Sequence, residues 1–222
     1  MIRKLISGLA SGGLKGHFGQ WGEDILVRKL FPRTMKTGAY LDLGCYHPFV
    51  HSNTAYLWLK GWSGVNVDAN PNTIDIFNKL RPKDRNIWAA IVSNRDYEGG
   101  NKEVSLKLST ATGISAMGTT DAGLAASRGF QQEVSVPATS MSELLRSEKL
   151  GPVDYINIDV EGCDQLIIDD IDLTILGPKV ITIEDYTASF ELLLVSSITT
   201  SLRSRGYSLV GRAGPTSVFL RD

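Results

Sequence analysis

The sequence predicts an α/β fold built on one open, mostly parallel sheet with an antiparallel hairpin strand at its C-terminal end. Apolar, β-rich runs alternate with helical patterns between residues 40 and 184, as in strand–helix–strand units whose parallel strands are joined by right-handed crossovers. A length of 222 residues suits one domain with a full core. Near the end, GRAGPT separates two short β-rich runs, which is a hairpin signal. We assign 18–222 to a single domain and 1–17 to an N-terminal lead-in segment.

The first half of the chain holds the clearest strand–helix–strand unit, at residues 40–70. Its strands are rich in Val, Leu and Tyr, as expected of strands buried on both faces. The elements expected in this half are a helix at 20–30, a strand at 40–43, a helix at 54–60 capped by Ser52 or Asn53, a strand at 62–68, a helix started by Asn70 and Pro71, and a strand at 86–92.

The second half alternates in the same way after a less legible stretch, 93–131. The later part of that stretch is rich in Gly, Ser, Thr and Ala, which is typical of a long loop or of a mobile segment lining a site. The elements expected here are strands at 102–108, 132–137, 153–159 and 179–184, a helix capped by Ser140, a helix with Leu166, Ile167 and Ile171, hairpin strands at 207–210 and 217–220, and one last helix carrying Phe190, Leu194, Val195, Ile198 and Leu202 up to Gly206.

Composition limits the partners and the compartment. A net charge of −1 gives no electrostatic case for binding nucleic acid. Cys45 and Cys163 lack zinc or redox spacing, and their use fits a reducing compartment. No apolar run is long enough to span a bilayer. We therefore expect a cytoplasmic protein with no stable membrane insertion, and we leave a homo-oligomer open.

The turn after the first strand decides which kind of ligand fits. In open α/β sheets the ligand binds outside the carboxyl ends of the strands, where the strand order reverses. A dinucleotide site needs several glycines there, but Gly44 is followed by the bulky Cys45-Tyr46-His47-Pro48, which disfavours an NAD-linked dehydrogenase. Asp68, at the tip of the second strand, suits a ribose diol, although an aspartate there could also serve only the turn or the next helix. A ligand with a ribose but no phosphates fits both facts, and S-adenosylmethionine is the common cofactor of that kind.

Several segments, taken in order, resemble the FkbM family of S-adenosylmethionine-dependent methyltransferases: FGQWGED, GAYLDLGCYHP, SNT, GWSGVNVDANP, VDYINIDVEG and VITIED. The resemblance implies a Rossmann-like class I methyltransferase sheet and O-methylation, commonly of a sugar or polyketide hydroxyl. One departure is the bulky turn that starts at Tyr46, where many members have a small polar run. The cofactor positions that the resemblance implies are Asp42, Gly44 and Asp68, with Asn53 and Asn70 as neighbours and with Gln20 and Glu23 as a flap on the methionine end.

Four acids follow two later strands, Asp159 and Glu161 after one and Glu184 and Asp185 at the tip of another. A sugar hydroxyl is a poor nucleophile until it is deprotonated, so a base or a metal ion is useful. In one mechanism Asp159 or Glu161, with help from His47, takes the proton. In the other, Asp159, Glu184 and Asp185 hold Mg²⁺, an arrangement similar to that of catechol-type methyltransferases. Acids at strand ends also cap helices, and this structural role stays open for Glu161 and Asp185.

The function predicted from these features is S-adenosylmethionine-dependent O-methylation of a saccharide hydroxyl, in a surface polysaccharide or a glycosylated natural product. The acceptor is then a small molecule or an oligosaccharide. Two alternatives stay open. One is a methyltransferase for a protein or polyketide hydroxyl, and the other is a non-catalytic module that binds S-adenosylmethionine.

Overall fold

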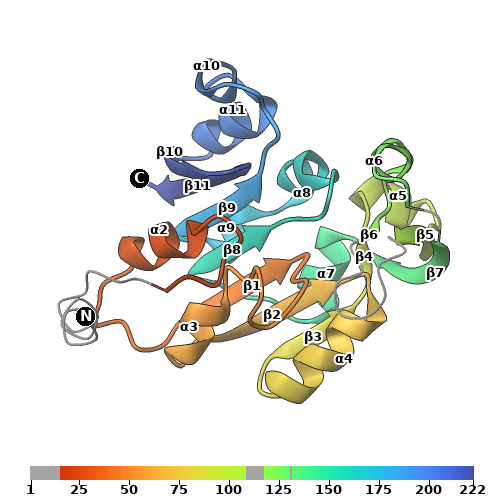
Figure 1. Cartoon of the computed structure of the whole chain (residues 1–222), viewed down its shortest axis with the longest axis horizontal. Helices are drawn as coiled ribbons and strands as arrows, with labels where there is room; N and C mark the ends of the chain where they lie inside the picture. The colour runs from red at the N-terminus through yellow and green to blue at the C-terminus, as the bar shows by residue number, and fades with distance from the viewer. Residues whose placement is uncertain (1–15, 109–117, 131) are drawn as a thin grey trace, which may run out of the picture.

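The computed structural model describes residues 16–108, 118–130 and 132–222 (Figure 1). Most of the lead-in, 1–17, and part of the stretch 93–131 lie outside these residues. No helix within them is long and apolar enough to cross a bilayer. The elements are α2 (Glu23–Leu30), β1 (Ala39–Leu43), α3 (Ala55–Leu59), β2 (Ser63–Asp68), α4 (Pro71–Leu80), β3 (Arg85–Trp88), β4 (Ala90–Ile91), α5 (Asn94–Glu98), β5 (Glu103–Leu108), β6 (Gly118–Thr119), α6 (Ala122–Ser127), β7 (Gln132–Thr139), α7 (Met141–Ser147), β8 (Tyr155–Ile158), α8 (Asp164–Asp170), α9 (Leu173–Leu176), β9 (Val180–Glu184), α10 (Phe190–Leu193), α11 (Ser197–Ser204), β10 (Tyr207–Ala213) and β11 (Thr216–Arg221).

The main sheet has seven strands in the order β10-β11-β9-β8-β1-β2-β3. The strands from β9 to β3 run parallel, and the C-terminal hairpin of β10 and β11 is antiparallel. This confirms the predicted fold class. The chain moves from β1 outward to β2 and β3, and then crosses to β8 on the other side of β1. The strand order therefore reverses at β1, where a ligand crevice is expected at the carboxyl ends.

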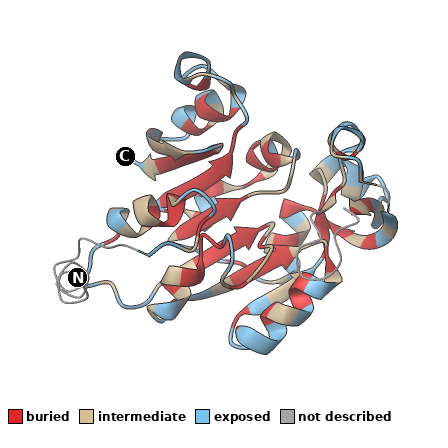
Figure 2. Cartoon of the chain, in the orientation of Figure 1, coloured by how far each residue is buried: buried red, intermediate tan, exposed pale blue. Residues whose placement is uncertain are grey.

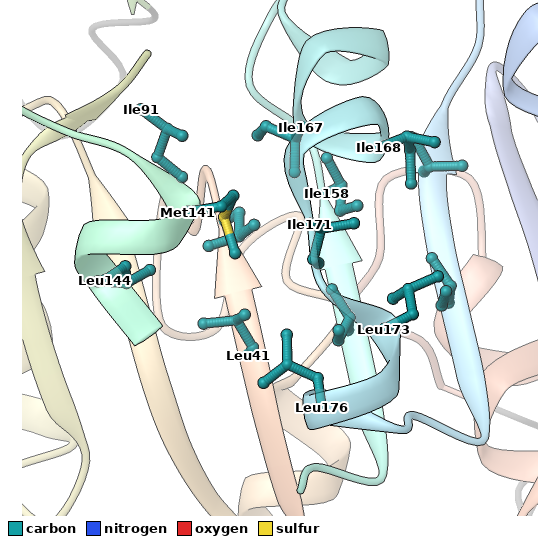
Figure 3. Close-up of a cluster of buried hydrophobic side chains, with 14 of the residues drawn as sticks. Leu41, Ile91, Met141, Leu144, Ile158, Ile167, Ile168, Ile171, Leu173 and Leu176 are labelled. Carbon is teal, nitrogen blue, oxygen red and sulfur yellow. The ribbon is translucent and has the colours of Figure 1, made fainter. Parts of the chain in front are cut away.

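One face of the main sheet is apolar. Leu41, Ile158 and neighbouring side chains of the strands pack against α7, α8, α9 and α11 (Figure 3). Figure 2 shows the central strands buried along their length, as expected of a parallel sheet covered on both faces. This face is the main hydrophobic core.

The opposite face carries a buried row of polar side chains, Asp42, Asn157 and Thr182, which we call the polar ladder. These residues are register partners on β1, β8 and β9. Asn157 Nδ2 donates to Asp42 Oδ1 at 2.9 Å, and Thr182 Oγ1 donates to Asn157 Oδ1 at 2.7 Å. Thr54 Oγ1, next to α3, donates to the other Asp42 oxygen at 2.7 Å. The ladder is thus hydrogen-bonded within itself, as buried polar groups must be, and it fixes α3 on this face.

Arg81, which follows α4, is completely buried on the same face. Its guanidinium donates to Thr54 Oγ1 at 2.9 Å, to Ser52 Oγ at 3.2 Å and to the carbonyl of Pro48. It therefore ties the turn after β1 to the end of α4. The turn residues are occupied in this way, so the expected capping of the helix at 54–60 by Ser52 or Asn53 is wrong: Thr54 is the N-cap residue and no side chain caps that helix.

The expected single strand at 86–92 is interrupted at Ala89. Its first part, β3, stays in the main sheet, whereas β4 pairs in parallel with β7. The strands β4-β7-β5-β6, in that order, form a second sheet, which lies to the right in Figure 1. In the described part of 93–131, β5 confirms the expected strand at 102–108, and the later part, expected as a loop or mobile segment, holds β6 and α6.

The expected last helix is two helices, α10 and α11. Ser189 and Ser196 each cap a helix start, accepting from the amides of Leu192 and Thr199. Because the chain turns between them, Val195 is 71% exposed, and Phe190 and Leu194 are also exposed, whereas the predicted core positions Ile198 and Leu202 are buried. The apolar stripe expected of one continuous helix is thus split.

Candidate active site

An open cavity lies at the carboxyl ends of the main-sheet strands and against the second sheet. It encloses about 1200 Å³ when its open mouth is counted. Of the predicted site residues, eight line it: Gln20, Glu23, Gly44, Asp68, Asn70, Asp159, Glu161 and Glu184.

Asp68 lies at the tip of β2 with both carboxylate oxygens held by backbone amides. Oδ2 accepts from Tyr46 N at 2.9 Å and Oδ1 from Asn70 N at 2.8 Å. The helix α4 is capped by Asn70, which accepts from Asn72 N at 3.0 Å. Asp68 therefore closes the turn and does not cap the helix. Burial raises its pKa to about 6, although the two amide hydrogen bonds act in the opposite direction.

Gly44 sits where the turn after β1 meets β8. Its φ is +78°, and a Cβ added there would lie 1.7 Å from the carbonyl oxygen of Asp159. Its amide donates to Val67 O at 2.9 Å. Only glycine combines this left-handed conformation with such close contact to another strand's backbone. The glycine in the turn thus serves the approach of β1 to β8.

Carboxylates gather at the tips of β8 and β9, and we call Asp159, Glu161 and Glu184 the acid cluster. Burial, together with the neighbouring acids, raises the pKa of Asp159 and raises that of Glu184 to about 7. Glu161 has a φ of +53° and pairs with Arg128 at 2.5 Å. Behind the cluster, Asp164 accepts from Val160 N and Gly162 N, both at 3.2 Å, and so fixes the turn after β8.

The predicted metal set of Asp159, Glu184 and Asp185 is not brought together. Asp185 accepts from Thr187 N at 2.9 Å and from Ser196 Oγ at 2.8 Å, so its carboxylate serves the turn before α10. Within the described ranges, no group of three or more His, Cys, Asp or Glu side chains could hold a metal ion. The prediction of a Mg²⁺ site at these residues is therefore not supported.

Three further predicted residues lie behind the cavity and do not line it. Asp42 belongs to the polar ladder, and Asn53 donates to Asn157 Oδ1 at 3.0 Å. His47 Nδ1 accepts from the amides of Phe49 and Val50, both at 3.0 Å. Burial and nearby Arg81 lower the pKa of His47, so the neutral ring shapes the turn.

Residues 42–209 match the family described as the methyltransferase FkbM domain. The chain belongs to the FkbM family. Among solved structures it is similar to a TehB-like SAM-dependent methyltransferase from Corynebacterium glutamicum, with 14% identity and a TM-score of 0.45, over 100% of this chain and 96% of that one. No curated protein matches it in sequence.

As an FkbM methyltransferase the protein uses S-adenosylmethionine, and the cavity offers suitable groups for that cofactor. The Asp68 carboxylate offers the kind of hydrogen-bond acceptor that ribose hydroxyls need. Beside it, small and apolar side chains suited to a flat ring come from both sheets, namely Val67, Ala69, Ala89, Ala90, Ile91 and Leu106. The cofactor supplies an electrophilic methyl group on a sulfonium, and the protein's acids suit the positive charge of that group.

The turn before α2 borders the cavity in the FkbM protein, where Gln20 and Glu23 line it. Glu23 is buried and accepts from Gln20 N at 3.1 Å and from Trp21 N at 2.8 Å. The rings of Tyr46 and His51 also line the cavity and stack at 5.9 Å with an interplanar angle of 12°. Both residues have a φ of +52°. Nothing in the local sequence indicates this conformation, so their part in the site was missed.

The pH dependence of stability is expected to reveal the buried state of Glu184. Its raised pKa means that the folded protein keeps a proton that the unfolded chain releases above about pH 4. The stability that the folded protein gains from holding this proton is therefore complete below about pH 4 and is lost as the pH rises through about 7. Glu184→Gln mimics the protonated form, so its gain in Tm over the wild type should be absent near pH 4.5 and largest above pH 7. A gain that is equal at both pH values would contradict this.

Proposed function

We propose that this FkbM-family protein transfers the methyl group of S-adenosylmethionine to a hydroxyl of a saccharide, in a surface polysaccharide or a glycosylated natural product. The observation that carries the proposal is one cavity with the Asp68 carboxylate, which suits a ribose, at one end and the acid cluster at the other. The free cysteines Cys45 and Cys163 fit a reducing compartment, and we place the reaction in the cytoplasm.

The strand order sets the direction in which the substrates lie. Along the sheet edge come Asp68 on β2, Gly44 after β1, Asp159 after β8 and Glu184 on β9. Neighbouring strands are about 4.8 Å apart, so the span from Asp68 to Glu184 is roughly 14 Å. A cofactor whose ribose binds Asp68 then extends past Gly44 toward Asp159, and the acceptor occupies the β9 side.

The charge of the cavity favours a saccharide over a phosphorylated acceptor. All charged residues among its described lining are acids, namely Glu23, Asp68, Asp159, Glu161 and Glu184. Carboxylates accept hydrogen bonds from several sugar hydroxyls, whereas they repel phosphate. Asp159, beside the Gly44 turn, balances the sulfonium charge, and the β9 side binds the hydroxyl that becomes methylated.

Replacing Asp68 tests the cofactor site. Asp68→Ala should weaken the binding of S-adenosylhomocysteine by roughly 10- to 100-fold, because hydrogen bonds to a charged group contribute about 1.5–3 kcal/mol. The dissociation constant can be measured by isothermal titration calorimetry. Asp75→Ala, an exposed aspartate of α4, is the matched control and should bind like the wild type. Equal affinity in Asp68→Ala and Asp75→Ala would contradict the ribose role.

An acceptor panel tests the rest of the function. Methyl transfer from labelled S-adenosylmethionine should be detected with neutral mono- and oligosaccharides, and not with sugar phosphates or nucleotide sugars. If the protein instead methylates a hydroxylated polyketide or a protein in preference to saccharides, the saccharide assignment is wrong and that molecule is the acceptor. Binding of S-adenosylhomocysteine without transfer to any of them would favour a non-catalytic module.

A further inference from the structure

We propose that Glu184 accepts the proton of the acceptor hydroxyl, and that Tyr186 and Arg128 position its carboxylate. This rests on the proposed transfer to a hydroxyl and names the group that acts on it. Neither Tyr186 nor Arg128 was indicated by the sequence, because both depend on contacts between distant segments.

The Glu184 carboxylate is buried, and in the described structure only one of its two oxygens accepts a hydrogen bond. The residue is 8% exposed and lines the cavity. Oε1 accepts from Tyr186 OH at 2.8 Å. Oε2 is buried without a hydrogen-bond partner within the described structure. A buried carboxylate oxygen without a donor costs on the order of 1–3 kcal/mol or more, and a bound hydroxyl supplies the missing donor.

Tyr186 contacts this carboxylate at Oε1, and Arg128 contacts Tyr186 in turn. Arg128 Nη2 donates a hydrogen bond to the Tyr186 hydroxyl oxygen at 3.1 Å. The same hydroxyl donates its own hydrogen bond to Glu184 Oε1 at 2.8 Å. Arg128 Nη1 meanwhile pairs with Glu161 Oε2 at 2.5 Å. The chain Glu161–Arg128–Tyr186–Glu184 thus joins the end of α6 to the tips of β8 and β9, and it leaves Oε2 as the Glu184 oxygen without a donor in the described structure.

The other acids are less suited to take the proton. The Glu161 carboxylate is already engaged by the Arg128 guanidinium at 2.5 Å, so it is less free to meet a hydroxyl. Asp159 lies beside the Gly44 turn, on the cofactor side of the strand order. Glu184 lies one strand further out, where the acceptor is expected. The strand order therefore separates the acid that balances the sulfonium from the acid that meets the hydroxyl.

The proposed step balances as follows. The acceptor O–H bond breaks, and its proton goes to Glu184 Oε2. The acceptor oxygen forms a bond to the methyl carbon while the methyl–sulfur bond breaks. The electron pair of that bond stays on sulfur, which leaves neutral S-adenosylhomocysteine, the methyl ether and a protonated Glu184 that returns its proton to water. No other reactant is needed.

The groups facing Glu184 make it a suitable base near neutral pH. Burial raises its pKa to about 7, with Glu161 and Asp164 acting in the same direction. Tyr186 and Arg128 lower it, and the carboxyl of Asp159 adjoins it. A base works best when its pKa lies near the operating pH. Tyr186→Phe removes a donor to the charged form, so the pKa of Glu184 should rise in that variant.

The test is the pH profile of kcat/KM with a saccharide that the wild-type protein methylates. Glu184→Gln should lose at least 100-fold in kcat, while S-adenosylhomocysteine binds within about 3-fold of the wild type. Glu191→Gln, an exposed glutamate of α10, is the matched control and should keep the wild-type rate. Tyr186→Phe should move the acidic limb of the profile to higher pH, whereas loss of packing alone would lower the rate equally at every pH.

The outcomes separate the two proposals. Glu184→Gln with a rate within 2-fold of the wild type, or Tyr186→Phe with an unshifted acidic limb, would overturn the role of Glu184 while leaving saccharide methylation intact. Binding of S-adenosylhomocysteine without methylation of any saccharide by the wild type would overturn the acceptor assignment, and the role of Glu184 with it.

Discussion

Arg81→Met is expected to lower the free energy of unfolding by about 3–5 kcal/mol, the cost of breaking a buried charge network. Arg81 is completely buried, and its guanidinium is the donor to Tyr40 OH, Ser52 Oγ and Thr54 Oγ1. Methionine keeps much of the side chain's length but leaves these oxygens without that donor. Urea unfolding followed by circular dichroism measures the loss.

The same variant should also impair the cofactor site, because Arg81 holds the turn that carries Tyr46 and His51 to the cavity. S-adenosylhomocysteine should bind at least 10-fold more weakly where the protein is still folded. Arg203→Met is the matched control: Arg203 is exposed on α11, so a change within about 0.5 kcal/mol is expected. Equal losses in the two variants would show that Arg81 is not the anchor of the turn.

Gly44→Ala is expected to abolish measurable binding of S-adenosylhomocysteine, a loss of more than about 100-fold. The new Cβ would lie 1.7 Å from the Asp159 carbonyl oxygen, so β1 and β8 must separate at the point where the cofactor crosses them. Forcing atoms into such a packed contact costs roughly 1–3 kcal/mol or more, and the left-handed conformation adds about 1–2 kcal/mol. Calorimetry and thermal unfolding measure the two effects.

Gly206→Ala separates the conformational cost from the steric one. Gly206 has a φ of +82°, and nothing lies within 4 Å of the added Cβ. It should therefore lose only about 1 kcal/mol of stability and bind S-adenosylhomocysteine normally. Normal cofactor binding by Gly44→Ala would contradict the close approach of the two strands.

The sequence was most informative where structure depends on near neighbours. The alternation of strands and helices, the Asn70-Pro71 helix start and the terminal hairpin follow from local patterns, and the structure confirms them. Asp68 and Gly44 could be placed at strand tips for the same reason. The interruption at Ala89 could not, because β4 leaves the main sheet for a partner, β7, that lies more than forty residues further along the chain.

The roles of individual polar residues were harder to predict than their places. Asp42 and Asp68 belong to neighbouring strands of the same unit, yet Asp42 is part of the polar ladder, whereas Asp68 ends its strand and lines the cavity. Glu184 and Asp185 are adjacent, yet only the first lines the cavity. Alternation along a strand turns the adjacent Glu184 and Asp185 to opposite sides. Asp42 and Asp68 share one side of the sheet by register and differ in how near they lie to the strand tip, so their roles depend on the layers packed around the sheet.

The strand order also divides the site between two parts of the chain. The proposed cofactor residues Gly44 and Asp68 belong to the first ninety residues, whereas Asp159 and Glu184 come later and follow or end strands on the other side of β1. Substitutions in the later part can therefore reshape the acceptor side while the ribose contact stays intact. Such modularity gives an evolving family a way to change its acceptor and keep its methyl donor.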